Sequence, residues 1–193
     1  MATRPTSAQG ADDFEHALSA LHAASVRPEV RLTEVPAPTR IAPHAVAMTG
    51  DVLDANGEDE LATGRFVLLH DPSEPEPWGG PWRVVTYARA ELEPEVATDP
   101  VLGEVGWSWL VDALEERGVE LVAEAGTVTR VVSESYGDLE DRSVSVEMEI
   151  RASWSPQDAQ VGEHLEAWVD LLCTIGGLPP LPDGVVALPG RRR

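Results

Sequence analysis

The chain has 193 residues, of which 42% are hydrophobic, and 34 acidic residues against 14 basic ones give a formal net charge of −20. This hydrophobic content excludes a chain that is disordered throughout. The negative field repels phosphate backbones, so we expect no nucleic acid partner and a protein partner with a basic surface.

Three further features of the sequence bear on the cellular compartment of the protein. The start, MATRPTSAQGADD, lacks the apolar run of a signal peptide. No stretch approaches the roughly eighteen consecutive apolar residues of a membrane span. The single cysteine, Cys173, cannot form an internal disulfide. We therefore predict a cytoplasmic protein with no membrane partner.

The first predicted element is a helix over about residues 12–25, after a flexible lead over residues 1–11. Asp12 and Glu15 fit a capping box, and Phe14, Leu18 and Leu21 recur at helical spacing. Four extended segments follow, because β-type residues alternate there with clusters of turn residues. These are PEVRLTEVP, which suits an edge strand, IAPHAVAMTGDVL, GRFVLLHD and WRVVTYARAEL.

A central helix is predicted next, from Asp99-Pro100 to a left-handed cap at Gly118. Residues 119–137 then supply one or two strands, bent or turned at Gly126. The clearest strand is SVSVEMEIRASW, in which hydrophobic residues alternate with Ser, Glu and Arg. This period of two predicts one buried face and one wet face, as in an antiparallel sheet.

A third helix is predicted after Ser155-Pro156, and Gly176-Gly177 should end it with Leu178 in a Schellman contact. Its hydrophobic stripe comprises Val161, Leu165, Trp168, Leu172 and Ile175. Residues 179–193 are predicted to be an extended, Pro-rich tail ending in three arginines.

The element order predicts an α+β fold in one domain over residues 12–178. The strands occur in runs, which favours an antiparallel sheet of about five to seven strands over a doubly wound fold. The expected order is α-ββββ-α-ββ(β)-α, with the helices mainly on one face. Within the central helix, we expect Trp109 to face the sheet and Trp107 to meet the third helix or a second copy of the chain.

Several segments resemble one family along nearly the whole folded part. They are RAELEPEVATDPVLGEVGWSWLVDALEERG, GTVTRVVSESYG, EIRASWSP and HLEAWVDLLCTIGGLPP. They look like the blocks of an uncharacterised actinobacterial family, the domain-of-unknown-function family 3000. This resemblance implies no particular chemistry. The element order is also similar to that of the small acidic chaperones of type III secretion, which bind extended segments of partner proteins.

The sequence lacks the motifs of the common catalytic and cofactor sites. The five histidines are scattered, with no HExxH or CxxC, and there is no GxSxG, GxGxxG or GxxxxGK[ST]. Cys173 lies in an apolar helix, where a buried, inert thiol is expected. The charged residues of the strands (Glu147, Glu149, Arg151, Arg83, Arg89 and Glu91) should form cross-strand pairs on a wet face. We predict no catalytic residue, metal or cofactor.

Five residues are predicted as binding candidates: Trp78, Trp82, Trp107, Arg130 and Glu134. Trp78 stands in the loop DPSEPEPWGGP, where it either plugs one end of the sheet or anchors a partner, since tryptophan is common at binding hot spots. Arg130 and Glu134 share one strand face. We therefore predict a non-enzymatic, chaperone-like protein-binding module, with a homodimer as one form. The alternative is a small-molecule binder or enzyme with a pocket between the sheet and the central helix.

Overall fold

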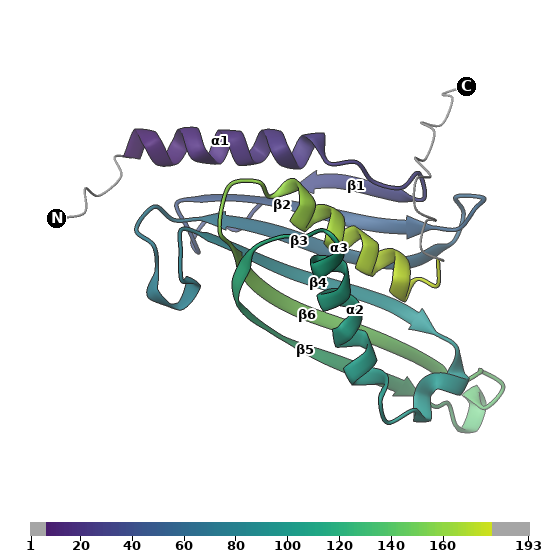
Figure 1. Cartoon of the computed structure of the whole chain (residues 1–193). Coiled ribbons are helices and arrows are strands. Elements are labelled where there is room, and N and C mark those ends of the chain that lie inside the picture. Colours follow the sequence, from purple (N-terminus) through teal and green to yellow (C-terminus); the bar gives the residue numbers. More distant parts are fainter. Residues whose placement is uncertain (1–6, 179–193) are drawn as a thin grey trace.

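Six strands form one antiparallel sheet in the order β1-β2-β3-β4-β6-β5 (Figure 1). The computed structural model describes residues 7–178. The strands are β1 (Val30–Val35), β2 (His44–Leu53), β3 (Glu60–His70), β4 (Trp82–Leu92), β5 (Leu121–Ser133) and β6 (Ser145–Pro156). Each strand pairs antiparallel with its neighbours. The predicted α+β fold with an antiparallel sheet is confirmed.

Three helices lie on one face of this sheet (Figure 1). They are α1 (Ser7–Ala23), α2 (Leu102–Glu116) and α3 (Gly162–Ile175). Helix α3 packs across β2, β3 and β4, α2 packs against α3 and β5, and α1 contacts α3 and β2. Short 3-10 helices occupy three connections, at η1 (Glu76–Trp78), η2 (Pro94–Thr98) and η3 (Gly137–Leu139). The order of helices and strands follows the prediction.

Local signals placed several element ends correctly. Strand β4 has the predicted bounds, and Gly118 after α2 has a positive φ of 62°. At the end of α3, Gly177 has a φ of 76°, and the Leu178 N–H donates to the Cys173 carbonyl at 2.9 Å. This is the predicted Schellman motif, because glycine adopts the left-handed conformation without a Cβ clash.

Besides the start of α2, which is Leu102 and not Pro100, three predicted boundaries are wrong. Helix α1 begins at Ser7, so Asp12 lies inside the helix rather than at its cap. Strand β3 begins at Glu60, inside the predicted loop, because pairing with β2 extends it. Ser155 and Pro156 end β6, where they pair with β5, and α3 begins only at Gly162. Pairing with a neighbouring strand decided the second and third cases. The predicted tail over residues 179–193 and most of the predicted lead lie outside the described residues.

The core lies between the sheet and the helices. On β6, the residues from Val146 to Trp154 that alternate toward the helices are all buried, as predicted. Val144, which is predicted on the same face, precedes the strand and is exposed. The five residues of the predicted α3 stripe are buried as well. Two glycines make room for the largest of them: a Cβ at Gly50 or Gly64 would lie 2.9 or 2.8 Å from the Trp168 ring. Trp168 therefore packs directly on the backbone of β2 and β3.

The two tryptophans of α2 have the opposite orientation to the predicted one. The Trp107 ring lies against Gly126 of β5, so Trp107 faces the sheet. Trp109 instead lines a hollow between α2 and α3, together with Cys173 and Leu178. The α2 residues with the deepest burial are Leu102, Gly106, Leu110, Ala113 and Leu114. The prediction failed because β5 lies at the sheet edge and α2 sits above it, which places the Trp107 side of the helix over the strand.

Candidate functional site

Four of the five predicted binding residues lie on or beside β5. Trp78 belongs to η1, which contacts β5, and the Trp107 ring covers Gly126 of that strand. Arg130 is a β5 residue, and its Nη1 donates to the Asp99 carbonyl at 2.6 Å. Glu134 follows the strand directly and accepts a hydrogen bond from the Tyr136 hydroxyl at 2.8 Å. These residues are spread along β5 and do not converge on one point.

The fifth residue, Trp82, is a core residue. It is 4% exposed, and its ring stacks on that of His70 with centroids 4.0 Å apart. His70 in turn stacks with Phe14 and His44, so an aromatic cluster joins α1 to β2, β3 and β4. Trp82 therefore offers little surface to a partner, whereas Trp78 is half-buried.

Strand β5 is an edge of the sheet and is the longest strand, with 13 residues. All of them are exposed except Leu121 and Val128, which are half-buried. The other edge strand, β1, has only 6 residues. An edge strand presents unpaired backbone N–H and C=O groups to solvent. β5 is therefore the longer of the two open hydrogen-bonding edges.

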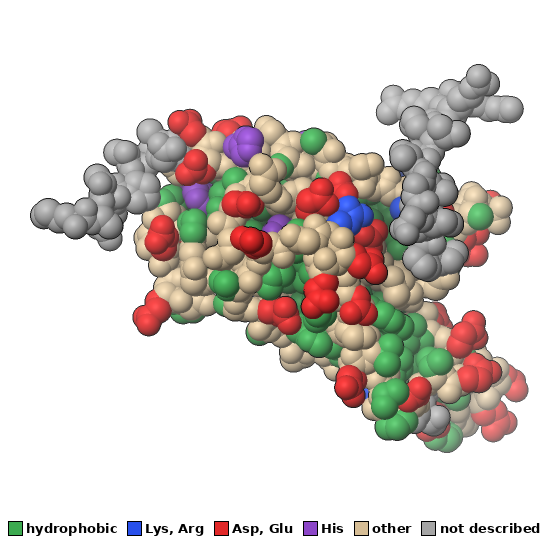
Figure 2. All heavy atoms as spheres, in the orientation of Figure 1, with side chains coloured by type: hydrophobic (Ala, Val, Ile, Leu, Met, Phe, Trp, Pro, Cys, Tyr) green, Lys and Arg blue, Asp and Glu red, His purple; other side chains and the backbone are tan. Residues whose placement is uncertain are grey.

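Hydrophobic side chains gather around β5 as well. Of the large hydrophobic residues that are exposed in the described chain, most belong to β5 or to the connection after it: Val122, Val131, Val132, Tyr136, Leu139 and Val144. Figure 2 shows hydrophobic side chains at the end of the molecule where β5 ends and α2 begins. Exposed apolar surface of this kind marks binding sites more often than chance.

The sheet face opposite the helices carries a trough. The strand register places five short side chains in one row across β2, β3, β4, β6 and β5, namely Ala47, Val67, Val85, Ser153 and Ala125. The next row contains Thr49, Arg65, Tyr87, Arg151 and Thr127, so long side chains stand beside the short ones. The resulting hollow has a volume of about 680 Å³.

The long side chains of the trough wall are held by polar contacts. Arg151 pairs with Glu149 at 2.6 Å, and its guanidinium lies 5.1 Å from the centre of the Tyr87 ring. The hydrogen bonds from Arg151 and from the Tyr87 hydroxyl lower the pKa of Glu149, so this carboxylate is ionised at neutral pH. Arg89 pairs with Glu147 across β4 and β6, which is one of the predicted cross-strand pairs. The prediction holds only in part, because Arg151 pairs within its own strand and Arg83 donates to Ser153, Ser155 and the Ala123 carbonyl.

Arg65 differs from Arg151 in its partners. Its Nη2 donates to the Pro36 carbonyl at 2.9 Å, and no carboxylate within residues 7–178 pairs with it. The trough lining contains Arg65 and Arg151 and no acidic residue. Since Arg151 is paired with Glu149, Arg65 is the charge of the lining that no carboxylate of this face balances within the described residues. The register of four strands creates this site, and no motif in the sequence marks it.

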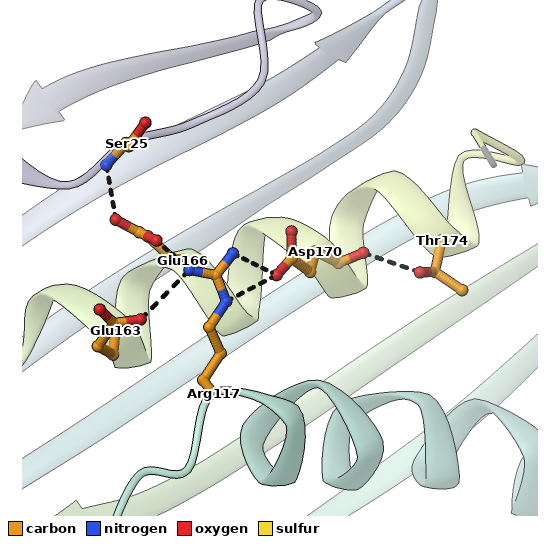
Figure 3. A network of polar contacts seen from close by, with 6 residues as sticks. All are labelled: Ser25, Arg117, Glu163, Glu166, Asp170 and Thr174. Carbon is orange, nitrogen blue, oxygen red and sulfur yellow. Dashed lines mark hydrogen bonds and ion pairs between the residues drawn. The ribbon is translucent and has the colours of Figure 1, made fainter. Parts of the chain in front are cut away.

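A polar cluster on the helix side joins α2 to α3 (Figure 3). Arg117, just after α2, donates to Asp170 at 2.7 Å and also pairs with Glu166 and Glu163 of α3. Glu166 accepts a hydrogen bond from the Ser25 N–H at 2.6 Å, which connects the segment after α1 to α3. Burial opposes the charge of Arg117, but the hydrogen bond to Asp170 raises its pKa overall. Arg117 thus contacts all three carboxylates of this cluster, so we interpret it as a structural cross-link.

The hollow beside this cluster has a volume of about 710 Å³ and lies between α2 and α3. Its one sulfur group is unsuited to nucleophilic chemistry, because burial raises the pKa of the Cys173 thiol to about 11. Within the described part of the chain, no three His, Cys, Asp or Glu side chains converge to hold a metal ion. None of the described helices is long and apolar enough to cross a membrane.

Comparison with known proteins places the chain in a family. No curated protein and no solved structure matches it. The model of one protein family matches residues 10–186, which is most of the chain. The match includes the four segments that resemble the family named above. The chain therefore belongs to the family described as protein of unknown function DUF3000.

Proposed function

We propose that this chain is a non-enzymatic protein-binding module that takes up an extended segment of another protein as a further strand beside β5. The observation that carries the proposal is the length and exposure of this edge: 13 residues, of which all but two are exposed. Strand addition to an open sheet edge is a recurrent mode of peptide recognition, in which backbone hydrogen bonds supply affinity.

The second half of β5 suits this role better than the first. The pairing with β6 is irregular between Val122 and Ala125, and Ala123 has a positive φ of 54°. Such an irregularity twists an edge and discourages further pairing. Residues 126–133, GTVTRVVS, pair regularly and are rich in β-branched side chains. The proposed binding edge is therefore this eight-residue stretch.

The charges around this edge favour a basic partner. The only charged residue within 126–133 is Arg130, whose guanidinium is turned to the Asp99 carbonyl. The connection that follows carries Glu134, Asp138, Glu140 and Asp141 against Arg142. A segment with Thr, Val or Ile along the edge and Lys or Arg beyond it would match both features. Two copies of this acidic chain would instead repel each other at long range.

The test compares two edge variants. Val131→Lys/Val132→Lys places charges on both sides of β5, and natural edge strands use Lys to prevent strand addition. Thr33→Lys makes a similar change on β1, the opposite edge. Each protein is immobilised and exposed to a lysate of the native cells, the bound segment is mapped by cross-linking mass spectrometry, and the synthetic segment is titrated.

We expect the Val131→Lys/Val132→Lys variant to bind this segment roughly tenfold more weakly or worse, and Thr33→Lys to bind it like the wild type. Binding should also weaken with added salt, because the flanking charges are exposed. Equal affinity of the double variant and the wild type would contradict the proposal. Light scattering that shows a dimer abolished by the double variant would assign the edge to a second copy instead.

A further inference from the structure

We infer that the trough on the open sheet face binds an aliphatic carboxylate, with the hydrocarbon chain across the strands and the carboxylate at Arg65. This site shares Gly126 and Thr127 with the proposed strand-addition edge, but the inference does not depend on that proposal. It rests on the shape of the trough, on its apolar floor and on an arginine without a carboxylate partner among the described residues.

The mostly apolar floor of the trough favours an apolar ligand. Val67, Val85 and Ala125 form most of it, and Val85 is 41% exposed although it lies on a central strand. The one polar side chain in this row is Ser153, whose hydroxyl accepts a hydrogen bond from Arg83. Only the end of the trough at β5 lies on an edge strand, and the backbone groups beneath the rest of it belong to β3, β4 and β6, which are paired on both sides. They are engaged in the sheet and offer no hydrogen bonds upward. A peptide lying in the trough would leave its own backbone groups unpaired, whereas a hydrocarbon chain has none to pair.

The direction and length of the trough fit an alkyl chain. Its floor crosses the strands, from Val67 on β3 to Ala125 on β5. Three strand spacings separate these positions, which corresponds to about 14 Å. Tyr87 and Arg151 form one side and contact each other. The hollow of about 680 Å³ is within the usual size of small-molecule sites.

The charge at one end selects the head group. A guanidinium has five N–H donors, and that of Arg65 has one protein acceptor, the Pro36 carbonyl. The charge of Arg151 is already matched by Glu149. A ligand carboxylate at Arg65 would form a charge-assisted, bidentate pair, and no acidic residue of the lining would repel it.

The experiment is a calorimetric titration of the full chain with decanoate, below its micelle-forming concentration, and with decanamide, which has the same chain without the charge. We expect one saturable decanoate site per chain. Arg65→Gln should weaken decanoate binding roughly tenfold or more and leave decanamide unchanged, because it removes only the charged pair. Val85→Gln should weaken the binding of both probes, because it makes the floor polar.

Arg142→Gln is the matched control, since Arg142 is exposed in the connection between β5 and β6 and outside the lining. It should bind decanoate like the wild type, as should the Val131→Lys/Val132→Lys variant, which tests the edge separately. Circular dichroism verifies that each variant is folded. The inference is overturned by the absence of saturable decanoate binding, or by equal affinity in Arg65→Gln and the wild type. Stoichiometric competition between decanoate and the β5-binding segment would also overturn it, because the trough would then belong to the protein site.

Discussion

The two faces of this sheet are built from the same strands but are held by different forces. On the helix side, β4 presents Trp82, Val84, Thr86, Ala88 and Ala90, all buried. On the other side, the same strand presents Arg83, Val85, Tyr87 and Arg89, which are half-buried or exposed. The first face depends on close packing, and the second depends on ion pairs that water screens. Because side chains alternate along the strand, one face contributes to the hydrophobic core and the other carries polar groups at the surface.

The largest effect expected from this comparison is on the helix side. Trp168→Ala should lower the free energy of unfolding by about 3–5 kcal/mol, because it removes a large side chain from the core and leaves a cavity. Trp168 is completely buried and packs on Phe66. Tyr87→Ala, on the open face, should cost much less. Chemical denaturation of both variants measures the difference, and equal losses would mean that the open face is packed like a core.

A pH effect should come from the same buried layer. The His164 Nδ1 accepts a hydrogen bond from Trp154 at 3.0 Å, and burial lowers the pKa of His164 from 6.5 to about 4. As the pH falls, the unfolded chain takes up this proton first. The stabilisation is therefore present above pH 6.5 and lost toward pH 4, by about 3 kcal/mol over this interval.

The check on this pH effect is urea denaturation at pH 7 and pH 4 of the wild type and of His164→Gln. Glutamine also offers an acceptor to Trp154 but does not titrate. The wild type should lose more stability on acidification than the variant. The same pH dependence in both proteins would show that His164 contributes nothing to it.

An intermediate effect is expected at the glycines under α3. In Gly64→Ala, the new Cβ would lie 2.8 Å from the Trp168 ring and would also meet the Tyr87 backbone carbonyl. Overpacking of this kind costs about 1–3 kcal/mol. Gly80→Ala is the control, since a Cβ there meets nothing within 4 Å and Gly80 is not among the glycines with positive φ. Thermal denaturation should separate the two variants, and equal midpoints would contradict the close approach of Trp168 to β3.

The smallest effect is expected on the open face. Replacing Glu147 and Glu149 together by Gln should change the stability by less than about 1 kcal/mol, because ion pairs at the surface contribute little even where the carboxylate is half-buried. Glu147 pairs with Arg89, and Glu149 pairs with Arg151. A loss several times larger, measured by urea denaturation, would show that another layer or a partner covers this face.

The sequence by itself determined the elements whose signals are local. The alternation in β6, the hydrophobic stripe of α3 and the glycines at 118 and 177 were readable, because each depends on backbone geometry over a few neighbouring residues. The class of the fold followed from the order of these elements. Four of the five predicted binding residues also lie on or beside one strand, β5, although their role remains a proposal.

Only the tertiary structure decided which residues meet across the sheet. The short row that includes Val67, Val85 and Ala125 combines residues of β3, β4 and β5, and a shift of one residue in any pairing would replace part of it with core residues. The position of α2 over the sheet edge likewise decided that Trp107, and not Trp109, lies against β5. Both outcomes depend on pairing and packing between distant segments, which local periodicity does not encode.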